Sequence, residues 1–229
     1  MKTRAGIFVF PGTNCDHDTL HVLKNVAGIE ADFIFHTERN WSKKYNFVIL
    51  PGGFSYGDYL RPGAIAKISP VIEELHVYVE KELGFVLGIC NGFQILTETG
   101  LLPGALIQND NLKFICKNVK LEVKRNDTPF TNLYSKGEIV EMPIAHRDGK
   151  YISPGINIDS LVVFTYHGEN PNGSFHNIAG IINEKKNVLG MMPHPERCAE
   201  EILGSTDGLK IFLSVKNYIS GLKSRKEEM

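Results

Sequence analysis

Cysteine is scarce in this sequence, and its few cysteines are not spaced as a metal site or a disulfide framework would require. They are far apart and no CxxC pair occurs; the four are Cys15, Cys90, Cys116 and Cys198. Zinc sites built from cysteine use closely spaced ligands, and disulfide-dense folds carry many cysteines in a short chain. The sequence therefore predicts neither a metal site nor a disulfide scaffold.

Net charge and long apolar runs are also lacking. The formal net charge is -1 at pH 7, so no strong electrostatic attraction to nucleic acid or to a membrane surface is expected. No apolar run approaches the roughly 18 residues of a membrane-spanning helix. The residues before the first apolar run are too few for a signal peptide. We expect a soluble protein of the reduced cytoplasm, with neither nucleic acid nor membrane as a partner.

As far as Gly100, the chain alternates short apolar runs with helical patterns. The run AGIFVF at 5–10 is continuous and apolar, which is typical of a buried strand in a parallel sheet. This alternation predicts an α/β fold with an open, mostly parallel, flavodoxin-like sheet and helices on both faces. The expected strands are 5–10, 31–36, 47–50 and 85–89. The expected helices are 16–26, 65–83 with a possible interruption at Pro70, and the stretch between Cys90 and Gly100.

Beyond Gly100 the apolar runs follow one another at hairpin-like spacing, which predicts an antiparallel extension at one edge of the sheet. An amphipathic pattern at 207–222 closes the chain as a helix. No repeat, low-complexity tract or linker is present, so we expect a single domain over 1–222 and a charged tail at 223–229. The expected strands of this half are 112–123, 139–142, 161–166, 178–183 and 188–192.

The strongest chemical signal lies in the stretch GFVLGICNGFQILTETG at 84–100. A strand would lead through a tight turn at Cys90 into a helix, which resembles the nucleophile elbow of hydrolases with sulfur in place of oxygen. Gly88 and Gly92 suit the close packing of such a turn. The N-terminus of the helix favours a thiolate over a thiol. The alternative is an inert buried cysteine, since free cysteine is among the most buried residue types.

A cysteine nucleophile needs a base, and the base needs an orienting partner. The best candidates lie in MMPHPER, where His194 stands between two prolines and Glu196 follows. This segment comes directly after the apolar strand 188–192, at a sheet edge where loops gather in open α/β folds. We interpret Cys90, His194 and Glu196 as a catalytic triad. The alternative is a solvated histidine on a surface loop.

An oxyanion would also need donors. Gly53 ends the segment Pro51-Gly52-Gly53 after the third strand, where its backbone N–H is accessible because no side chain covers it. The N–H of Asn91 is the second candidate donor, by the geometry of the elbow. The alternative is a plain turn, because Gly-Gly is itself a turn signal.

Cys15 is a rival nucleophile, because it too follows a strand and a turn and opens a helix. Asp16 and Asp18 place negative charge beside it, which disfavours a thiolate. The flanking glycines of the elbow are also absent. We therefore interpret Cys15 as a structural thiol.

Stretches from nearly the whole chain match one known family: FPGTNCDHDT, LPGGFSYGDYLRPGAIA, VLGICNGFQIL, LLPGAL, LKFIC, PIAHRDGKY, NPNGS, IAGI and NVLGMMPHPER. The sequence resembles the class I, or triad-type, glutamine amidotransferases. Within that class it is most similar to the glutaminase subunits of phosphoribosylformylglycinamidine synthase. Two departures occur: Pro62 follows Arg61 where a small residue is usual, and Arg147-Asp148 replaces the more usual Gly-Glu after Ala-His.

The resemblance implies how the triad would work. Cys90 would attack the side-chain amide of glutamine, and the oxyanion would rest on the N–H groups of Gly53 and Asn91. His194, oriented by Glu196, would protonate the departing ammonia and then activate water to hydrolyse the glutamyl thioester.

The resemblance also implies which residues hold the substrate. Gln94, one turn into the helix after the nucleophile, would bind glutamine. Asn172, Gly173 and Ser174 would form another wall of the pocket, although Asn-Pro and Asn-Gly also favour a plain turn.

The same resemblance implies partners. Ammonia would pass to a separate synthetase subunit, which would use ATP and Mg to convert formylglycinamide ribonucleotide to formylglycinamidine ribonucleotide in purine synthesis; a small third subunit is also expected. The chain has no Walker or dinucleotide-binding loop, so we expect no cofactor of its own. Extended loops at 56–61 and 145–151 are expected to face the partner.

Two other classes of function remain as alternatives. One is a free-standing cysteine hydrolase of the same fold, such as a γ-glutamyl hydrolase, which would turn over fully without a partner. The other is a catalytically silent binding module, which the retention of all three triad residues argues against.

Overall fold

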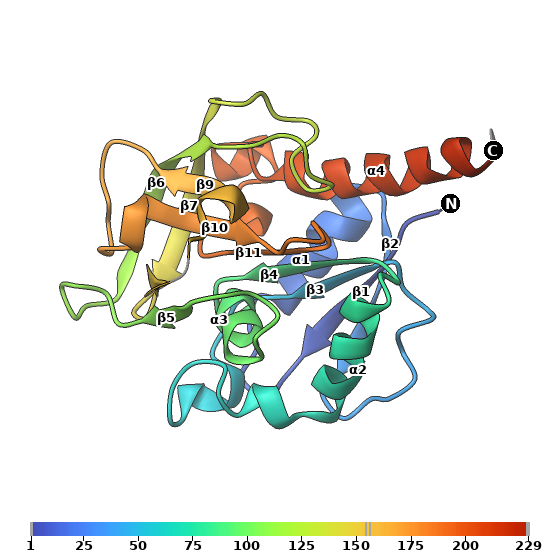
Figure 1. Cartoon of the computed structure of the whole chain (residues 1–229), viewed down its shortest axis with the longest axis horizontal. Coiled ribbons are helices and arrows are strands. Elements are labelled where there is room, and N and C mark those ends of the chain that lie inside the picture. The colour runs from blue at the N-terminus through green and yellow to red at the C-terminus, as the bar shows by residue number, and fades with distance from the viewer. Residues whose placement is uncertain (1, 154, 156, 228–229) are drawn as a thin grey trace.

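The fold is built on one large sheet (Figure 1). The structure is a computed structural model that describes residues 2–153, 155 and 157–227. Within those residues the large sheet has nine strands, in the order β2-β1-β3-β4-β11-β10-β9-β6-β7. The sheet changes from parallel to antiparallel at β11, which pairs in parallel with β4 and antiparallel with β10. One half of the sheet is therefore parallel, and the other half is an antiparallel extension.

The parallel half has the strand order of a flavodoxin-like sheet, β2-β1-β3-β4-β11. Each neighbouring pair in this half is parallel. β3 and β11 are buried along their whole length, as their continuous apolar sequences predict. The strands are β1 (Arg4–Val9), β2 (Glu30–Phe35), β3 (Phe47–Leu50), β4 (Phe85–Ile89) and β11 (Val188–Met191). The predicted parallel sheet is confirmed.

The antiparallel half is confirmed too. β10 pairs with β11 and β9, and β6 pairs with β9 and β7. The strands are β6 (Ile115–Val123), β7 (Ile139–His146), β9 (Val162–Tyr166) and β10 (Ile178–Ile182). β7 is longer than the expected strand at 139–142, because its pairing with β6 continues to His146, opposite Ile115.

Two short strands were not expected from the sequence. β5 (Ala105–Ile107) and β8 (Lys150–Ile152) form a separate antiparallel pair. Three residues are too few to show a strand period. The expected extended loop at 145–151 is therefore wrong: its first two residues end β7, its last two begin β8, and only 147–149 connect them.

Helices cover both faces of the parallel half. In Figure 1, α2 and α3 lie on one side of the strands, and α1 and α4 on the other. The helices are α1 (Asp16–His21), α2 (Pro70–Glu80), α3 (Asn91–Glu98) and α4 (Leu209–Glu227). None of them, within the described residues, is both long and apolar enough to cross a membrane.

Three helices differ from the expected boundaries. α1 gives way to a π-helical turn, Val22–Val26, that completes the expected helix. The expected helix at 65–83 is divided, because extended backbone at Ser69 separates a 3₁₀ turn from α2, which begins with Pro70 at its first position. α4 continues to Glu227, past the expected end at Leu222, and residues 228–229 of the expected tail lie outside the described residues.

A buried amide holds together the segments that follow β5 and β7. Asn109 is fully buried, and its Nδ2 donates to the carbonyls of Lys113 (2.9 Å) and His146 (3.0 Å). Its Oδ1 accepts from the N–H of Gly149 (3.0 Å) and from Nδ1 of His146 (3.1 Å). The two donations fix which amide atom is the oxygen, so Nδ1 of His146 carries the proton. Its Nε2 has no partner within the described part of the chain.

His146 should make stability depend on pH. Burial, together with the positive charge of His194, lowers the pKa of His146 to about 4. A histidine in the unfolded chain has a pKa of about 6.5, so between these values the unfolded chain binds more protons and acid favours unfolding. At about 1.4 kcal/mol per pKa unit, this difference in pKa contributes up to about 3 kcal/mol to the free energy of unfolding while His146 is neutral in both states. This is present above pH 6.5 and is lost as the pH falls towards 4.

We therefore expect His146→Gln to flatten the pH dependence of the free energy of unfolding from pH 6.5 to about 4, measured by urea titration. His76 is exposed on α2, and His76→Gln is the control that should keep the wild-type slope. If His146→Gln and wild type lost stability equally over this range, the buried ring would not be the titrating group.

Candidate active site

Three strand ends bring the predicted site together. β3, β4 and β11 are parallel neighbours, so the segments that follow them, 51–53, 90–91 and 192–196, emerge side by side. Open α/β sheets bind ligands at this edge of the sheet. Residues from distant parts of the sequence therefore meet here because of strand order alone.

Cys90 occupies a strained turn between β4 and α3. Its φ of 50° and ψ of -103° lie in a region that side chains rarely adopt. Its N–H donates to the carbonyl of Met191 (2.8 Å), which ties the turn to β11. A Cβ at Gly92 would collide with the carbonyl of Leu50, and one at Gly88 would press on the backbone of Gly92. The glycines of the predicted elbow are thus required by close packing.

His194 and Glu196 form a buried pair. Nδ1 of His194 donates to Oε1 of Glu196 at 2.6 Å, and each residue is 1% exposed. Burial lowers the pKa of His194, but the charges of Glu196 and Cys90 outweigh it and raise that pKa well above its ordinary value. These charges favour a protonated His194, with Glu196 fixing the orientation of its ring.

The second ring nitrogen of His194 is the one available for chemistry. Nε2 is buried and has no partner of hydrogen-bond geometry within the described residues. The negative charge of the Cys90 sulfur nevertheless contributes to the raised pKa of His194. The sulfur of Cys90 lies 3.7 Å from the carbonyl oxygen of Ala145. Catalytic hydrogen bonds often shorten only when substrate binds, so this arrangement suits a cysteine and histidine that act together.

Cys15 lies beside the pair, which the sequence did not predict. It is 1% exposed, and Nη2 of Arg197 donates to its sulfur at 3.0 Å. Its sulfur lies within 4.8 Å of ligand atoms of both His194 and Glu196. Gly52 lies against both His194 and Cys15. A Cβ at Gly52 would lie 2.7 Å from Cε1 of His194 and 3.1 Å from the sulfur of Cys15, so only glycine fits there. That Cys15 is a structural thiol stays a prediction, but its location belongs to the site.

The same three groups have the chemistry of zinc ligands. Arg197, however, already places a positive charge among them, since its Nε is 3.9 Å from Oε1 of Glu196. A metal cation here would meet that guanidinium at close range and would break the bond between His194 and Glu196. We therefore assign no metal to this cluster. Cys198 is also buried, and burial raises the pKa of its thiol to about 12, which keeps it unreactive.

Both predicted oxyanion donors lie at the site. Gly53 lines the cavity that contains Cys90, and its φ of 139° is a value that favours glycine. No hydrogen bond from its N–H is found within the described residues. Asn91 is the first residue of α3, so its N–H has no acceptor inside the helix. Two backbone N–H groups are thus free to bind an oxyanion.

The cavity beside Cys90 has a volume of about 240 Å³. Gln94 lines it, and both polar atoms of its side-chain amide are hydrogen-bonded. Its Nε2 donates to the carbonyl of Asp148 (2.6 Å) and its Oε1 accepts from Nδ2 of Asn91 (2.9 Å). The remaining lining residues are Gly53, Phe54, Gly57, Asp58, Phe114, Ala145, His146, Arg147 and Asp148.

Asn172, Gly173 and Ser174 take a different position from the one expected. They are absent from the lining of this cavity within the described residues. Nδ2 of Asn172 donates to the carbonyl of Gly149 (2.8 Å), and the hydroxyl of Ser174 accepts from the N–H of Tyr151 (3.0 Å). Asn172 and Ser174 thus hold the segment 149–151, which follows the lining residues Arg147 and Asp148.

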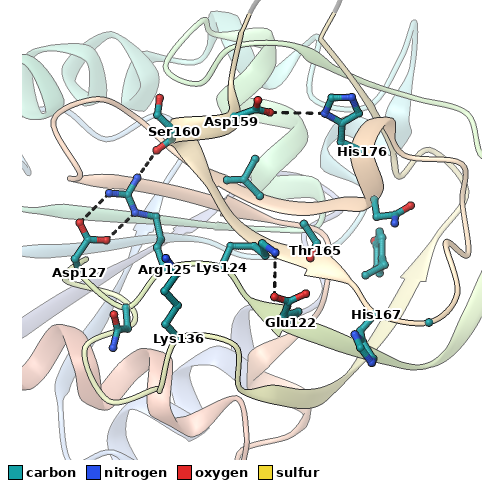
Figure 2. Close-up of a pocket in the computed structure, with 15 residues that line it drawn as sticks. Glu122, Lys124, Arg125, Asp127, Lys136, Asp159, Ser160, Thr165, His167 and His176 are labelled. Atoms are coloured by element: carbon teal, nitrogen blue, oxygen red, sulfur yellow. Dashed lines mark hydrogen bonds and ion pairs between the residues drawn. The ribbon is translucent and has the colours of Figure 1, made fainter.

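A larger open cleft, of about 1050 Å³, lies over β6 and β9 (Figure 2). Arg125 is bound there by Asp127, and Lys124 by Glu122, so these charges are already compensated. None of the predicted site residues is in its described lining. The chemistry therefore belongs to the smaller cavity at the strand ends.

Comparisons with known proteins identify the family of the chain. A family model described as a CobB/CobQ-like glutamine amidotransferase domain matches residues 2–219. The chain is 52% identical over 226 residues to the phosphoribosylformylglycinamidine synthase subunit PurQ of Alkaliphilus metalliredigens, covering 96% of this chain and 99% of the relative. It is 53% identical over 223 residues to the subunit of that name from Thermus thermophilus, covering 93% and 97%.

Solved structures of glutamine amidotransferases are similar to this chain as well. The structure of PurLQS from Thermotoga maritima matches with a TM-score of 0.89 and 49% identity, over 96% of this chain and 100% of that chain. A glutamine amidotransferase from Thermotoga maritima matches with a TM-score of 0.56 at 17% identity, over 99% and 86%, and shows the fold alone. The chain belongs to the CobB/CobQ-like glutamine amidotransferases and, among them, to the family of PurQ subunits.

Proposed function

We propose that this chain is the glutaminase subunit of phosphoribosylformylglycinamidine synthase. It hydrolyses glutamine to glutamate and ammonia and passes the ammonia to a synthetase subunit. One observation carries the proposal: Cys90 stands in a strained elbow at the strand end next to the buried pair of His194 and Glu196. The relatives of nearly full length that are named PurQ support the choice of reaction.

The reaction follows from the positions of these groups. Cys90 attacks as the thiolate: its sulfur bonds to the amide carbon of glutamine, and the carbonyl oxygen becomes an oxyanion that accepts hydrogen bonds from the N–H groups of Gly53 and Asn91. His194, which starts protonated, gives its proton to the leaving nitrogen, so that ammonia departs and a thioester remains. It then takes a proton from water, which attacks the thioester and releases glutamate and the thiolate. Glu196 keeps the ring oriented throughout.

The remaining site residues act on the substrate and on the wall around it. Gln94 lines the cavity and binds glutamine together with the neighbouring backbone. Asn172 and Ser174, with Gly173 between them, position the segment 149–151 that follows the cavity wall at 147–148, rather than touching the substrate. We propose that 1–222 act as one domain, in the cytoplasm.

The synthetase subunit supplies the other half of the reaction. It binds ATP and Mg and aminates formylglycinamide ribonucleotide, while this chain needs no cofactor. A small third subunit completes the assembly, which the likeness to PurLQS supports. The loop at 56–61 is suited to a partner, because Tyr59 and Leu60 are 74% and 89% exposed near the mouth of the cavity. Arg61 anchors its end through two hydrogen bonds to Glu98.

The triad should behave as a unit. His194→Ala should lower glutamine-dependent activity by roughly 10²–10⁴-fold, because general acid and base catalysis is lost. Glu196→Ala should cause a smaller loss, since the ring remains but is no longer oriented. The double variant should be little worse than His194→Ala alone. Steady-state ammonia release in the assembled complex measures this, and strictly additive losses would mean that Glu196 has a separate role.

The coupling to a synthetase is tested by changing the nitrogen source. The isolated chain should hydrolyse glutamine weakly and should be strongly activated by the synthetase with its nucleotide ligands. In the assembled complex, Cys90→Ala should abolish product formation from glutamine and leave product formation from ammonium largely intact. Cys116→Ala removes an exposed thiol on β6 and is the matched control.

Two results would contradict the proposed division of labour. One is an assembled Cys90→Ala complex that loses both nitrogen sources equally. The other is full glutaminase activity of the isolated chain, which would favour the free-standing hydrolase instead.

A further inference from the structure

Asp58 is a carboxylate whose position no step of the proposed reaction explains. It lines the cavity that contains Cys90 and is partly buried there. Its one hydrogen bond within the described residues comes from Nδ2 of Asn91 at 3.4 Å, and that amide group is bound more closely by Gln94 at 2.9 Å. Asp58 therefore lies against the residue that follows the nucleophile, yet it has no close donor of its own.

The loop that carries Asp58 is turned to present it. Tyr56, Gly57 and Asp58 all have positive φ, at 53°, 68° and 55°. Two of these residues have side chains, which disfavour this backbone conformation. Gly12 holds the loop by accepting a hydrogen bond from the N–H of Phe54 at 3.0 Å. Such a conformation persists where surrounding structure fixes it, as at ligand sites.

A second carboxylate and an unpartnered nitrogen line the same cavity. The side chain of Asp148 is 16% exposed and is bound by Nε of Arg147 at 2.9 Å. His146 is 3% exposed, and its Nε2 is an acceptor without a partner within the described chain, because its proton is on Nδ1. The cavity thus has two carboxylates and one neutral imidazole nitrogen as acceptors, but only one guanidinium. One negative charge therefore has no positive partner among the described lining residues.

We propose that Asp58, with Asp148 beside it, binds the α-ammonium group of glutamine while the side-chain amide lies at Cys90. Glutamine carries an ammonium and a reactive amide at opposite ends of one short chain, so a cavity with Cys90 at one end needs an anion at the other. Arg147, 56% exposed at the rim, suits the α-carboxylate. This inference rests on the proposed glutaminase function and adds the group that recognises a free amino acid.

The electrostatics of the cavity support this assignment. Burial, together with the charge of Asp148, raises the pKa of Asp58 to about 6, and Arg147 opposes this rise. A carboxylate held in this way gains stability when a cation binds beside it. The rival explanation is that Asp58 only fixes the loop through Asn91. That role would affect every substrate equally, whereas an ammonium-binding role affects only substrates that carry the ammonium.

The test compares two substrates in the assembled complex. L-Glutamine and 4-carbamoylbutanoate share the reactive amide, but the second lacks the α-ammonium group. Asp58→Asn should lower kcat/KM for glutamine by about 10–100-fold, the range expected for losing a charge-assisted hydrogen bond. The loss should come mainly from KM. The loss with 4-carbamoylbutanoate should be much smaller, so the preference for glutamine collapses, and Asp148→Asn should shift it in the same direction.

Asp127→Asn is the matched control, because Asp127 is a carboxylate in the distant cleft of Figure 2; it should leave the preference unchanged. Equal losses on both substrates with Asp58→Asn, or no loss on either, would overturn the assignment of Asp58. Assembly with the synthetase and alkylation of Cys90 show whether each variant is folded. A folded wild-type complex that releases ammonia from neither substrate would instead overturn the proposed function itself, and this inference with it.

Discussion

The ion pair between His194 and Glu196 is the interaction on which the site depends. Both residues are almost fully buried, and burial alone would keep the imidazole neutral. The carboxylate at 2.6 Å reverses that preference, so the ring carries a proton that it can give to a leaving group. Removing one partner of a buried pair leaves an uncompensated charge. Arg197, bound to Cys15 and close to Glu196, balances the surrounding charge and ties the pair to the start of α1.

This pair can lie next to Cys90 only because the backbone around it packs very closely. β11 and β4 are paired in parallel, and the N–H of Cys90 reaches the carbonyl of Met191. Gly52 admits the ring of His194, and Gly92 admits the carbonyl of Leu50. The sheet therefore does more than support the loops: its strand order brings nucleophile, base and oxyanion donors to one edge. The substrate cavity is completed from the antiparallel half, by the segment after β7.

The sequence predicts the parts of this site that local patterns encode. An elbow needs glycines at fixed offsets from its cysteine, and His194 and Glu196 are two residues apart, so each signal is contained in one short stretch. The large sheet was predictable for the same reason, because its central strands β3, β4 and β11 are continuous apolar runs. β5 and β8 were missed because three-residue strands show no period. The ends of α2 and α4 differed because capping and tertiary packing decide where a helix stops.

What remained hidden depends on contacts between distant segments. Cys15 resembles an ordinary thiol until the fold places Arg197 against it, and nothing near Asn109 in the sequence indicates that it orients His146. The cavity wall at 147–148 was predicted to be a partner surface, because only the fold shows that Gln94 reaches the carbonyl of Asp148. The central claim, that Cys90 and not Cys15 is the nucleophile, is tested most directly by a diazo-ketone analogue of glutamine, followed by peptide mapping of the complex. We expect an adduct on Cys90 that forms more slowly in His194→Ala; an adduct mainly on Cys15 would contradict this assignment.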